Sequence, residues 1–463
     1  MRAAEHRREL VTLAYPVYAE LLSGVTAGII NMVWVARLGG HAVAAVAVAT
    51  NVENLLLGVI FVAGSGTTVL VARARGAGDR AATHSAVRGG WALWAVITPV
   101  VAVGGYLCRE PLARLLLGGG EGGSLRLATG YFAIALPGIA VLFATNVVDG
   151  ILKGMGDTRT PMRLAAVANG SILVLDPLLI LGCGLGVRGA AIATVLGRSA
   201  ALACGLVVLH RGRASRRPAE AAECGIGSLG ADARRTARTG LPMSADFVVR
   251  MAGALALVAV VARIGVDEVA AYGIATKAMY VATMAFYSVR QAAAIHTAHL
   301  LGAGHDQRRA VGRQALLLSG ALGLSALLIL LTAAPWIMRA FGSQGEVAEA
   351  GALYLRCLGP YLVLLACFIA LGGVFEGSGA SPALARVTLC GTTLQLALAY
   401  GLSGWGLPGI CLAMASSMAL QCAAVGRMYL RTGRMGRTER PPATGSEADR
   451  PWIPAAAASD ETH

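Results

Sequence analysis

The chain contains about twelve apolar runs that are each long enough to cross a lipid bilayer. A spanning helix needs about 20 mostly apolar residues, and its backbone groups must be satisfied within the segment because lipid offers no partners. Hydrophobic residues make up 56% of the chain and charged residues 14%. We therefore predict an all-α polytopic membrane protein. The expected spans are 10–36, 43–71, 86–107, 127–151, 162–183, 189–209, 241–264, 268–298, 313–334, 350–374, 384–403 and 406–428.

Arginine and lysine predict the orientation of these spans. Most of the 39 Arg and Lys residues fall in every second loop, on the same side as the N-terminus. By the positive-inside rule both termini are then cytoplasmic, and the arginine-rich start leads into a retained first helix rather than a cleaved signal peptide. The net charge of +14 is explained by topology. We expect a bacterial inner-membrane protein that binds no nucleic acid.

The two halves of the chain resemble each other. Residues 15–51 match 241–277 without insertion, so that Pro16 falls on Pro242 and Glu20 on Asp246. Each half holds six expected helices, an even number, so both halves have the same orientation. Parallel repeats of this kind are typical of transporters. The predicted organisation is an N-terminal lobe (1–210), a cytoplasmic linker (211–239), a C-terminal lobe (240–430) and a disordered tail (431–463).

Asp176 lies near the middle of an apolar run and is followed by Pro177. A carboxylate within a membrane span is costly, and such residues usually mark an ion or substrate path. The alternative is a structural aspartate held by a neighbouring asparagine or by backbone groups; we prefer the functional interpretation. Asn169 precedes Asp176 by seven residues, so both lie on one helix face.

The first helix carries a second polar face, formed by Glu20, Ser23 and Asn31, because eleven residues bring an α-helix almost back to the same side. We expect Glu20 and Ser23, together with Asp246, to line a substrate cleft. Pro16 and Pro242 are predicted hinges.

Other charged residues allow two interpretations. Asp149 and Lys153 are four residues apart and are predicted to form a helical ion pair. Asp246 and Arg250 have the same spacing, and mutual neutralisation is favoured over substrate binding. Glu53 has no evident local partner, and its role is left open. Four aromatic residues of the second half are predicted to pack rather than to bind a cation: Tyr272, Tyr280, Phe286 and Tyr287.

Common catalytic motifs are absent from the sequence. It has no Walker A, GxSxG or HExxH pattern, and its nine cysteines form no CxxC pair or His/Cys cluster. This argues against ATP-driven transport, common hydrolase chemistry and a zinc site. We expect no enzyme activity, no metal site and no cofactor other than a coupling ion.

Three motifs resemble the MATE family, the multidrug and toxic compound extrusion transporters, and most closely its prokaryotic DNA-damage-inducible (DinF-like) branch. They are WVARLGG at 34–40 with the preceding Pro16, LKGMGDTRTPM at 152–162, and LDPLLILG at 175–182. The likeness covers about residues 8–430. It implies two six-helix lobes around a central cleft and export driven by a proton or sodium gradient.

The resemblance also implies a polar ion site in the N-terminal lobe. The family's fourth-helix Asn falls on Asn146, its fifth-helix Asp on Asp176 and its sixth-helix Thr on Thr194. Two positions depart from the pattern, because the first-helix Asp is Asn31 here and a fifth-helix Asn is Ile172. Asn169 can replace the lost asparagine, and Glu20 supplies an acid on the Asn31 face.

The hypothesis is an antiporter that exports amphipathic, cationic small molecules in exchange for protons, or else sodium, by alternating access. It acts as a monomer in the bilayer, with Asp176 as the main proton carrier. One alternative is a lipid-linked sugar flippase of the same superfamily, which would favour a basic cleft. Another is a membrane-embedded enzyme that modifies lipids, although the sequence has no DxxD or HxxxD signature.

Overall fold

The computed structural model describes residues 3–116, 123–214, 228–340 and 345–438, which form twelve long helices and one short helix. The first half contains α1 (Ala3–Ala36), α2 (Gly40–Gly76), α3 (Arg80–Leu107), α4 (Arg109–Leu116), α5 (Gly123–Gly154), α6 (Arg159–Pro177), a π-helical turn (Leu178–Gly182) and α7 (Gly186–Ala214). The second half contains α8 (Leu229–Val261), α9 (Val266–Gly302), α10 (Arg308–Ala340), α11 (Gly345–Ser378), α12 (Ser381–Leu402), a 3₁₀ turn (Ser403–Trp405) and α13 (Gly406–Thr438).

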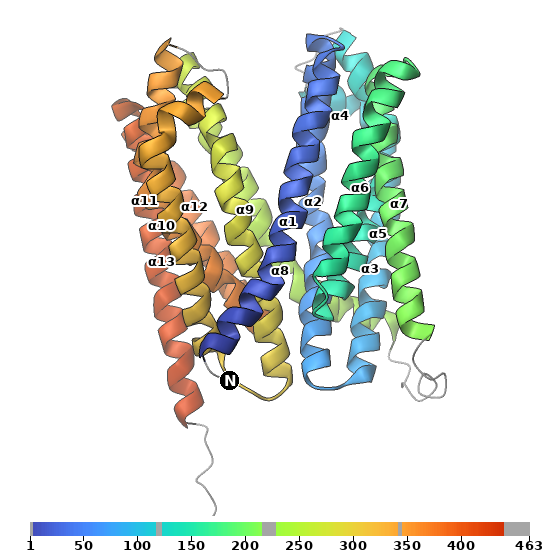
Figure 1. Cartoon of the computed structure of the whole chain (residues 1–463), viewed down its shortest axis with the longest axis vertical. Helices are drawn as coiled ribbons and strands as arrows, with labels where there is room; N and C mark the ends of the chain where they lie inside the picture. Colours follow the sequence, from blue (N-terminus) through green and yellow to red (C-terminus); the bar gives the residue numbers. More distant parts are fainter. Residues whose placement is uncertain (1–2, 117–122, 215–227, 341–344, 439–463) are drawn as a thin grey trace, which may run out of the picture.

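The long helices run roughly side by side and form two lobes, one from each half of the chain (Figure 1). Within the described ranges, eleven helical stretches are long and apolar enough to cross a membrane, and the last of them, Ser381–Arg431, combines α12 and α13. The predicted fold class is therefore confirmed. The short helix α4 was not predicted, because its charged residues interrupt the apolar pattern.

Side chains on the outside of the bundle are strongly apolar. On α3, Val96, Val100, Val103 and Leu107 are each more than half exposed and follow one another at helical spacing. A stripe of this kind would be unfavourable in water. It fits a surface that faces lipid.

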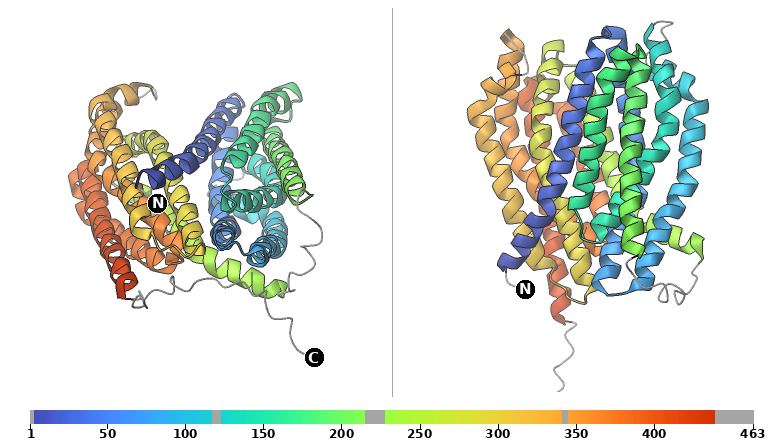
Figure 2. Two further views of the ribbon diagram at one scale, coloured as in Figure 1. Left: turned by 60° about the horizontal axis from the view of Figure 1, so that its bottom comes forward. Right: turned by 45° about the vertical axis from the view of Figure 1, so that its right-hand side comes forward.

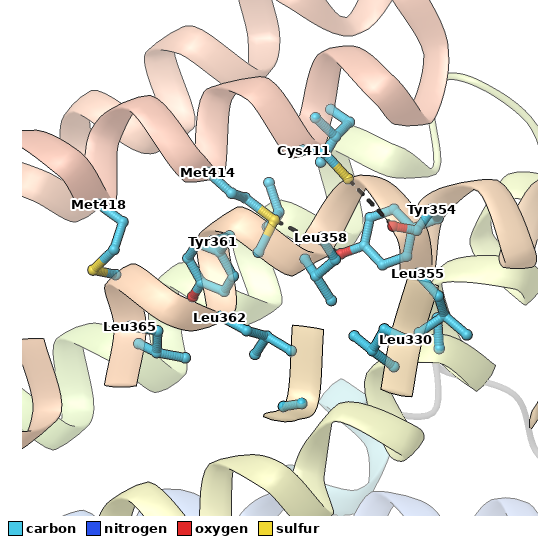
Figure 3. Close-up of a cluster of buried hydrophobic side chains, with 14 of the residues drawn as sticks. Leu330, Tyr354, Leu355, Leu358, Tyr361, Leu362, Leu365, Cys411, Met414 and Met418 are labelled. Carbon is cyan, nitrogen blue, oxygen red and sulfur yellow. Dashed lines mark hydrogen bonds between the residues drawn. The ribbon is translucent and has the colours of Figure 1, made fainter. Parts of the chain in front are cut away.

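The core of the C-terminal lobe is built around α11. Tyr354 is 1% exposed, and its hydroxyl lies 3.7 Å from the Met414 sulfur on α13 (Figure 3). The Cys411 thiol is directed at the Tyr354 carbonyl oxygen, also at 3.7 Å. Tyr272 packs against Tyr354 with ring centroids 5.4 Å apart and planes tilted by 59°, and Phe286 has no exposed surface. These contacts confirm packing roles for Tyr272 and Phe286.

Two helices cross between the lobes. The first turns of α1 lean onto α9 and α10, and the rest of the helix packs on α6 (Figure 2). His6 of α1 is fully buried there, 3.0 Å from His296 of α9. Conversely, the start of α8 packs on α2 and α3, where Asp232 accepts hydrogen bonds from Arg88 and Ser85. The interior prolines Pro16 and Pro242 lie in these two crossing helices, and proline permits a bend because it lacks an amide proton.

The lobes touch closely at the end of the bundle where the N-terminus lies. There the last turn of α2 meets the last turn of α9, and a Cβ atom on Gly76 would overlap the carbonyl oxygen of His299. A Cβ atom on Gly302 would overlap the carbonyl oxygen of Arg73 in the same way. Only glycine allows this approach of the two backbones.

We therefore expect Gly76→Val to force α2 and α9 apart and to destabilise the closed contact by roughly 1–3 kcal/mol, as overpacking does elsewhere. The measurements are the thermal unfolding midpoint in detergent and the labelling rate of a cysteine introduced at this crossing. Gly104→Val on α3 is the matched control, since a Cβ atom there meets nothing within 4 Å. If Gly76→Val and Gly104→Val have the same unfolding midpoint and the same labelling rate, Gly76 is not needed for the close contact of α2 and α9.

Two predicted boundaries differ from the structure. The proposed linker, 211–239, is helical at both ends, because α7 continues to Ala214 and α8 already begins at Leu229. The proposed tail, from 431, begins within α13, which continues to Thr438. Hydropathy locates the apolar part of a helix, whereas the backbone hydrogen bonds continue into the polar segment. Residues 215–227 and 439–463 lie outside the described residues.

Candidate functional site

A polar seam joins α1 to α6 inside the N-terminal lobe. Asn31 donates an amide hydrogen bond to the Asp176 carboxylate at 2.8 Å. Asn169 donates to the Ser23 hydroxyl at the same distance. The predicted polar face of α1 therefore meets the predicted polar face of α6. Asn169, however, pairs with Ser23 rather than with Asp176.

Asp176 is fully buried, and its Oδ1 atom has no hydrogen-bond partner in the described part of the chain. Among the described residues, the neutral Asn31 is its only side-chain partner, and it forms no ion pair. Pro177 follows it and the helix changes to a π-helical turn at Leu178–Gly182, a distortion that is common at functional sites.

Asn146 and Thr194 do not complete this cluster. The Asn146 amide donates to the Leu142 carbonyl and lines the central cavity described below, and the Thr194 hydroxyl bonds the Ala190 carbonyl one turn before it. Among the described residues no hydrogen bond joins Asn146 or Thr194 to Asp176, so the predicted set of three stays a prediction. Asn31 takes their place beside the carboxylate.

A second polar group lies in the same lobe. Tyr131 of α5 donates its hydroxyl to Glu53 of α2 at 3.1 Å, which supplies the partner that the sequence did not reveal for Glu53. Arg198 of α7 is a further charge in this lobe that was overlooked, although an arginine within the apolar run 189–209 is itself a signal of function.

A cavity of about 200 Å³ lies between the lobes, and charged residues of both lobes line it. On the wall from the N-terminal lobe, Lys153 donates to Glu20 at 2.8 Å. Lys153 therefore forms its hydrogen-bonded ion pair with Glu20, 133 positions away in sequence, and not with the predicted Asp149. Asp149 lines the same wall, and none of the described residues forms a hydrogen bond with its Oδ1 atom.

The wall from the C-terminal lobe is an ion-pair network. Asp246 is paired with Arg250, as predicted, and also with Arg290 of α9 at 2.7 Å. Thr388 of α12 donates a further hydrogen bond to Asp246. Arg290 in turn binds Glu376 of α11 at 2.5 Å. Arg290 and Glu376 were not predicted as site residues, although each is a charge within an apolar run.

The cavity brings together three of the residues predicted for a cleft or ion path: Glu20, Asp246 and Asn146. Ser23 belongs to the seam between α1 and α6 instead. A cavity between two lobes of a parallel repeat, lined by charged residues of both, is typical of multi-pass membrane transporters.

Comparisons with known proteins agree with this class. The MatE family matches residues 16–178 and again 242–401, so the chain belongs to this family. The two matches begin at Pro16 and Pro242, the positions that the internal repeat aligned. Members of the family are transporters and not enzymes.

Curated relatives carry transporter names. The chain is 24% identical over 384 residues to "Probable multidrug resistance protein NorM" of Thermotoga maritima, and this match covers 81% of each chain. It is 28% identical over 322 residues to the "FAD transporter" of Shewanella oneidensis, covering 67% of this chain and 68% of the relative. A shorter match, 34% over 107 residues and 23% of each chain, to "DNA damage-inducible protein F" of Escherichia coli gives weak support to the predicted branch.

Solved structures share the fold. A multidrug resistance MATE family transporter of the MOP superfamily, solved in an outward-facing conformation, superposes with a TM-score of 0.85 at 21% identity and covers 94% of this chain and 97% of its own.

Proposed function

We propose that this protein is an antiporter that exports amphipathic small molecules in exchange for protons. The observation that carries the proposal is Asp176, a fully buried carboxylate beside a neutral amide and without an ion-pair partner among the described residues. A charge in such a place is costly. Binding a proton removes it, and water that enters the lobe can deliver or accept that proton.

Proton coupling is favoured over sodium coupling by the same geometry. Sodium is a hard cation that needs several oxygen ligands. Asn31 presents an N–H group to the Asp176 carboxylate, and Asn146 and Thr194 bond their own helices. All three side chains are donors in these bonds and keep their oxygens available, so the preference rests on charge: among the described residues Asp176 is the single carboxylate of the seam between α1 and α6, and a proton needs only one carboxylate.

Alternating access would use the two helices that cross between the lobes. Opening the closed end must separate α2 from α9 and move the first turns of α1, so we assign the hinge role to Pro16 and Pro242. The substrate would bind in the central cavity. The names of the relatives, multidrug resistance protein and FAD transporter, support small organic molecules as cargo.

Growth of a bacterial host that lacks its own drug pumps tests the export function. Expression of the protein should raise the inhibitory concentration of amphipathic dyes several-fold and lower their accumulation in the cells. Expression of Asp176→Asn at an equal level is the control. If the wild-type protein changes neither quantity for any of a broad set of compounds, the multidrug form of the proposal is wrong.

The proposed location is the inner membrane, with both termini in the cytoplasm. The positive-inside rule motivates this orientation. Alkaline phosphatase and fluorescent-protein fusions at Gly212 and after residue 438 should both report the cytoplasm. A periplasmic signal at either position would overturn the orientation.

A further inference from the structure

A basic basin lies in the N-terminal lobe, at the end of the bundle opposite the N-terminus. It is a cavity of about 730 Å³ between α4, the beginning of α5 and the beginning of α7, all of which lie near the top of Figure 1. Each of these helices contributes one arginine to the lining: Arg109, Arg126 and Arg188. The basic basin and the central cavity have no described lining residue in common.

The three guanidinium groups have no carboxylate partner within the described ranges. Arg109 donates a hydrogen bond to the Tyr106 carbonyl oxygen at 2.7 Å, and its guanidinium lies 4.2 Å from the centroid of the Tyr106 ring. Arg126 and Arg188 are exposed. The basin therefore presents cationic groups that an anion from outside the protein can reach and bind through charge-assisted hydrogen bonds.

The glutamates of this corner do not neutralise the basin. Glu110 lines it but binds Arg114 at 2.6 Å, and Arg114 does not line it. Glu121 is the second acid between Arg109 and Arg126 and lies outside the described residues. With both glutamates counted, the four arginines of the corner still leave two positive charges. In the proposed orientation this is the end away from the cytoplasm, where the positive-inside rule disfavours such an excess, so the excess favours a binding role.

The backbone brings two of the arginines to one side of α5. A Cβ atom on Gly130 would lie 2.9 Å from the Arg188 Nε atom, so the Arg188 side chain passes over α5 at a residue without a side chain. Arg126 lies one turn before Gly130 on the same helix face. The N-terminal ends of α5 and α7 also lie in this corner, and the partial positive charge of a helix N-terminus adds to the attraction of an anion.

An apolar surface leads from the lipid to the basin. The exposed stripe of α3 ends at Leu107, which is 70% exposed and stands two residues before Arg109. Leu115 of α4 is 78% exposed. A phosphate group among the arginines would therefore leave an attached hydrocarbon chain free to lie on the outside of α3. A soluble phosphate would use the charges but leave this apolar surface without a role.

We propose that the basic basin binds the phosphate group of an anionic phospholipid, whose acyl chains lie against the exposed stripe of α3. Guanidinium groups bind phosphate oxygens through paired, charge-assisted hydrogen bonds. An anionic headgroup is favoured over a zwitterionic one, because the arginines repel the amine of the latter. Lipid binding here is separate from the proposed export function and does not depend on it.

Photo-crosslinking in nanodiscs tests the lipid site. The full-length protein is placed in phosphatidylcholine nanodiscs that contain a small share of phosphatidylglycerol with a photoreactive diazirine in its acyl chain, and the labelled peptides are identified by mass spectrometry. We expect labelling of residues 96–116 to be at least about tenfold stronger than with phosphatidylcholine that carries the same diazirine. Each arginine near a membrane surface gives about a fivefold preference for an anionic lipid.

Arginine substitutions locate the headgroup. The triple variant Arg109→Gln, Arg126→Gln and Arg188→Gln should lower the labelling of residues 96–116 by phosphatidylglycerol to the level of phosphatidylcholine. Arg126→Gln alone, at an exposed position, should lower it about fivefold and keeps the test valid if the triple variant folds poorly. A control triple variant should leave the labelling unchanged. It removes three exposed arginines that lie at the same end beside aromatic rings but do not line the basin: Arg37→Gln, Arg263→Gln and Arg339→Gln.

An equal loss of labelling in the two triple variants, with the thermal unfolding midpoint of the wild-type protein, would overturn the proposal, because positive charge at this end in general would then account for the binding. Equal labelling by the two lipids would overturn it as well. Soluble glycerol phosphate distinguishes a lipid from a free phosphate. An excess of it should not reduce the labelling, whereas an excess of unlabelled phosphatidylglycerol should. Loss of labelling with the soluble compound would indicate a site for free anions and overturn the assignment to a lipid.

Discussion

Asp176→Asn is expected to abolish proton-driven export while the fold and substrate binding persist. The amide oxygen of the new side chain can still accept the Asn31 hydrogen bond, so the seam between α1 and α6 keeps its contact. Only the titrating group is lost. Initial rates of substrate movement under a pH gradient should fall to those of protein-free liposomes, whereas the affinity for a transported substrate, measured at equilibrium in nanodiscs, should stay within about twofold.

Two neighbouring substitutions give this prediction its controls. Glu20→Gln should reduce coupled export less, since Glu20 is held by Lys153 in the cavity wall and can keep one hydrogen bond. Asn31→Asp replaces the N–H donor by a second carboxyl group. The protein should tolerate it if the two groups hold one proton between them, and the pH optimum of export should then move. Normal export by Asp176→Asn would exclude Asp176 as the proton carrier.

Arg290→Met is expected to cause the largest loss of stability in the protein. Arg290 is 5% exposed and is shared by Asp246 and Glu376. Removing it leaves Glu376 as a buried charge without its partner, which costs about 3–5 kcal/mol in comparable cases. The thermal unfolding midpoint in detergent and the yield of monodisperse protein should both fall sharply.

A second substitution should restore most of that loss. In Arg290→Met combined with Glu376→Gln the orphaned charge is removed, and Asp246 still has Arg250 and Thr388. Burying a neutral pair is often no worse than burying an ion pair. If the double variant is as unstable as Arg290→Met alone, the cost comes from lost packing and not from the unpaired carboxylate.

The sequence predicted relations within one helix better than relations between helices. Helical spacing placed Ser23 and Asn31 on one face and paired Asp246 with Arg250, and the structure agrees. Glu20, which was predicted on the same face, binds Lys153 in the cavity wall instead. The repeat was also visible, because proline, arginine and an acidic residue recur at matching positions in both halves. These signals are local or periodic, and a single sequence carries them.

The partners between helices were harder to predict. Lys153 was assigned to Asp149, four residues away, but it binds Glu20 on another helix. Arg290 and Glu376 escaped notice although they complete the C-terminal-lobe network. A pattern shows which face of a helix is polar, but the crossing of α1 and α8 between the lobes decides which faces meet.

Export in proteoliposomes of reconstituted protein, with either a proton or a sodium gradient imposed alone, tests the central claim most directly. The account predicts that a proton gradient drives accumulation of the substrate against its own gradient, that a sodium gradient of equal size at uniform pH does not, and that Asp176→Asn is inactive in both. Movement driven by sodium alone, or normal proton-driven movement by Asp176→Asn together with an inactive Asp246→Asn, would contradict it and place coupling in the central cavity.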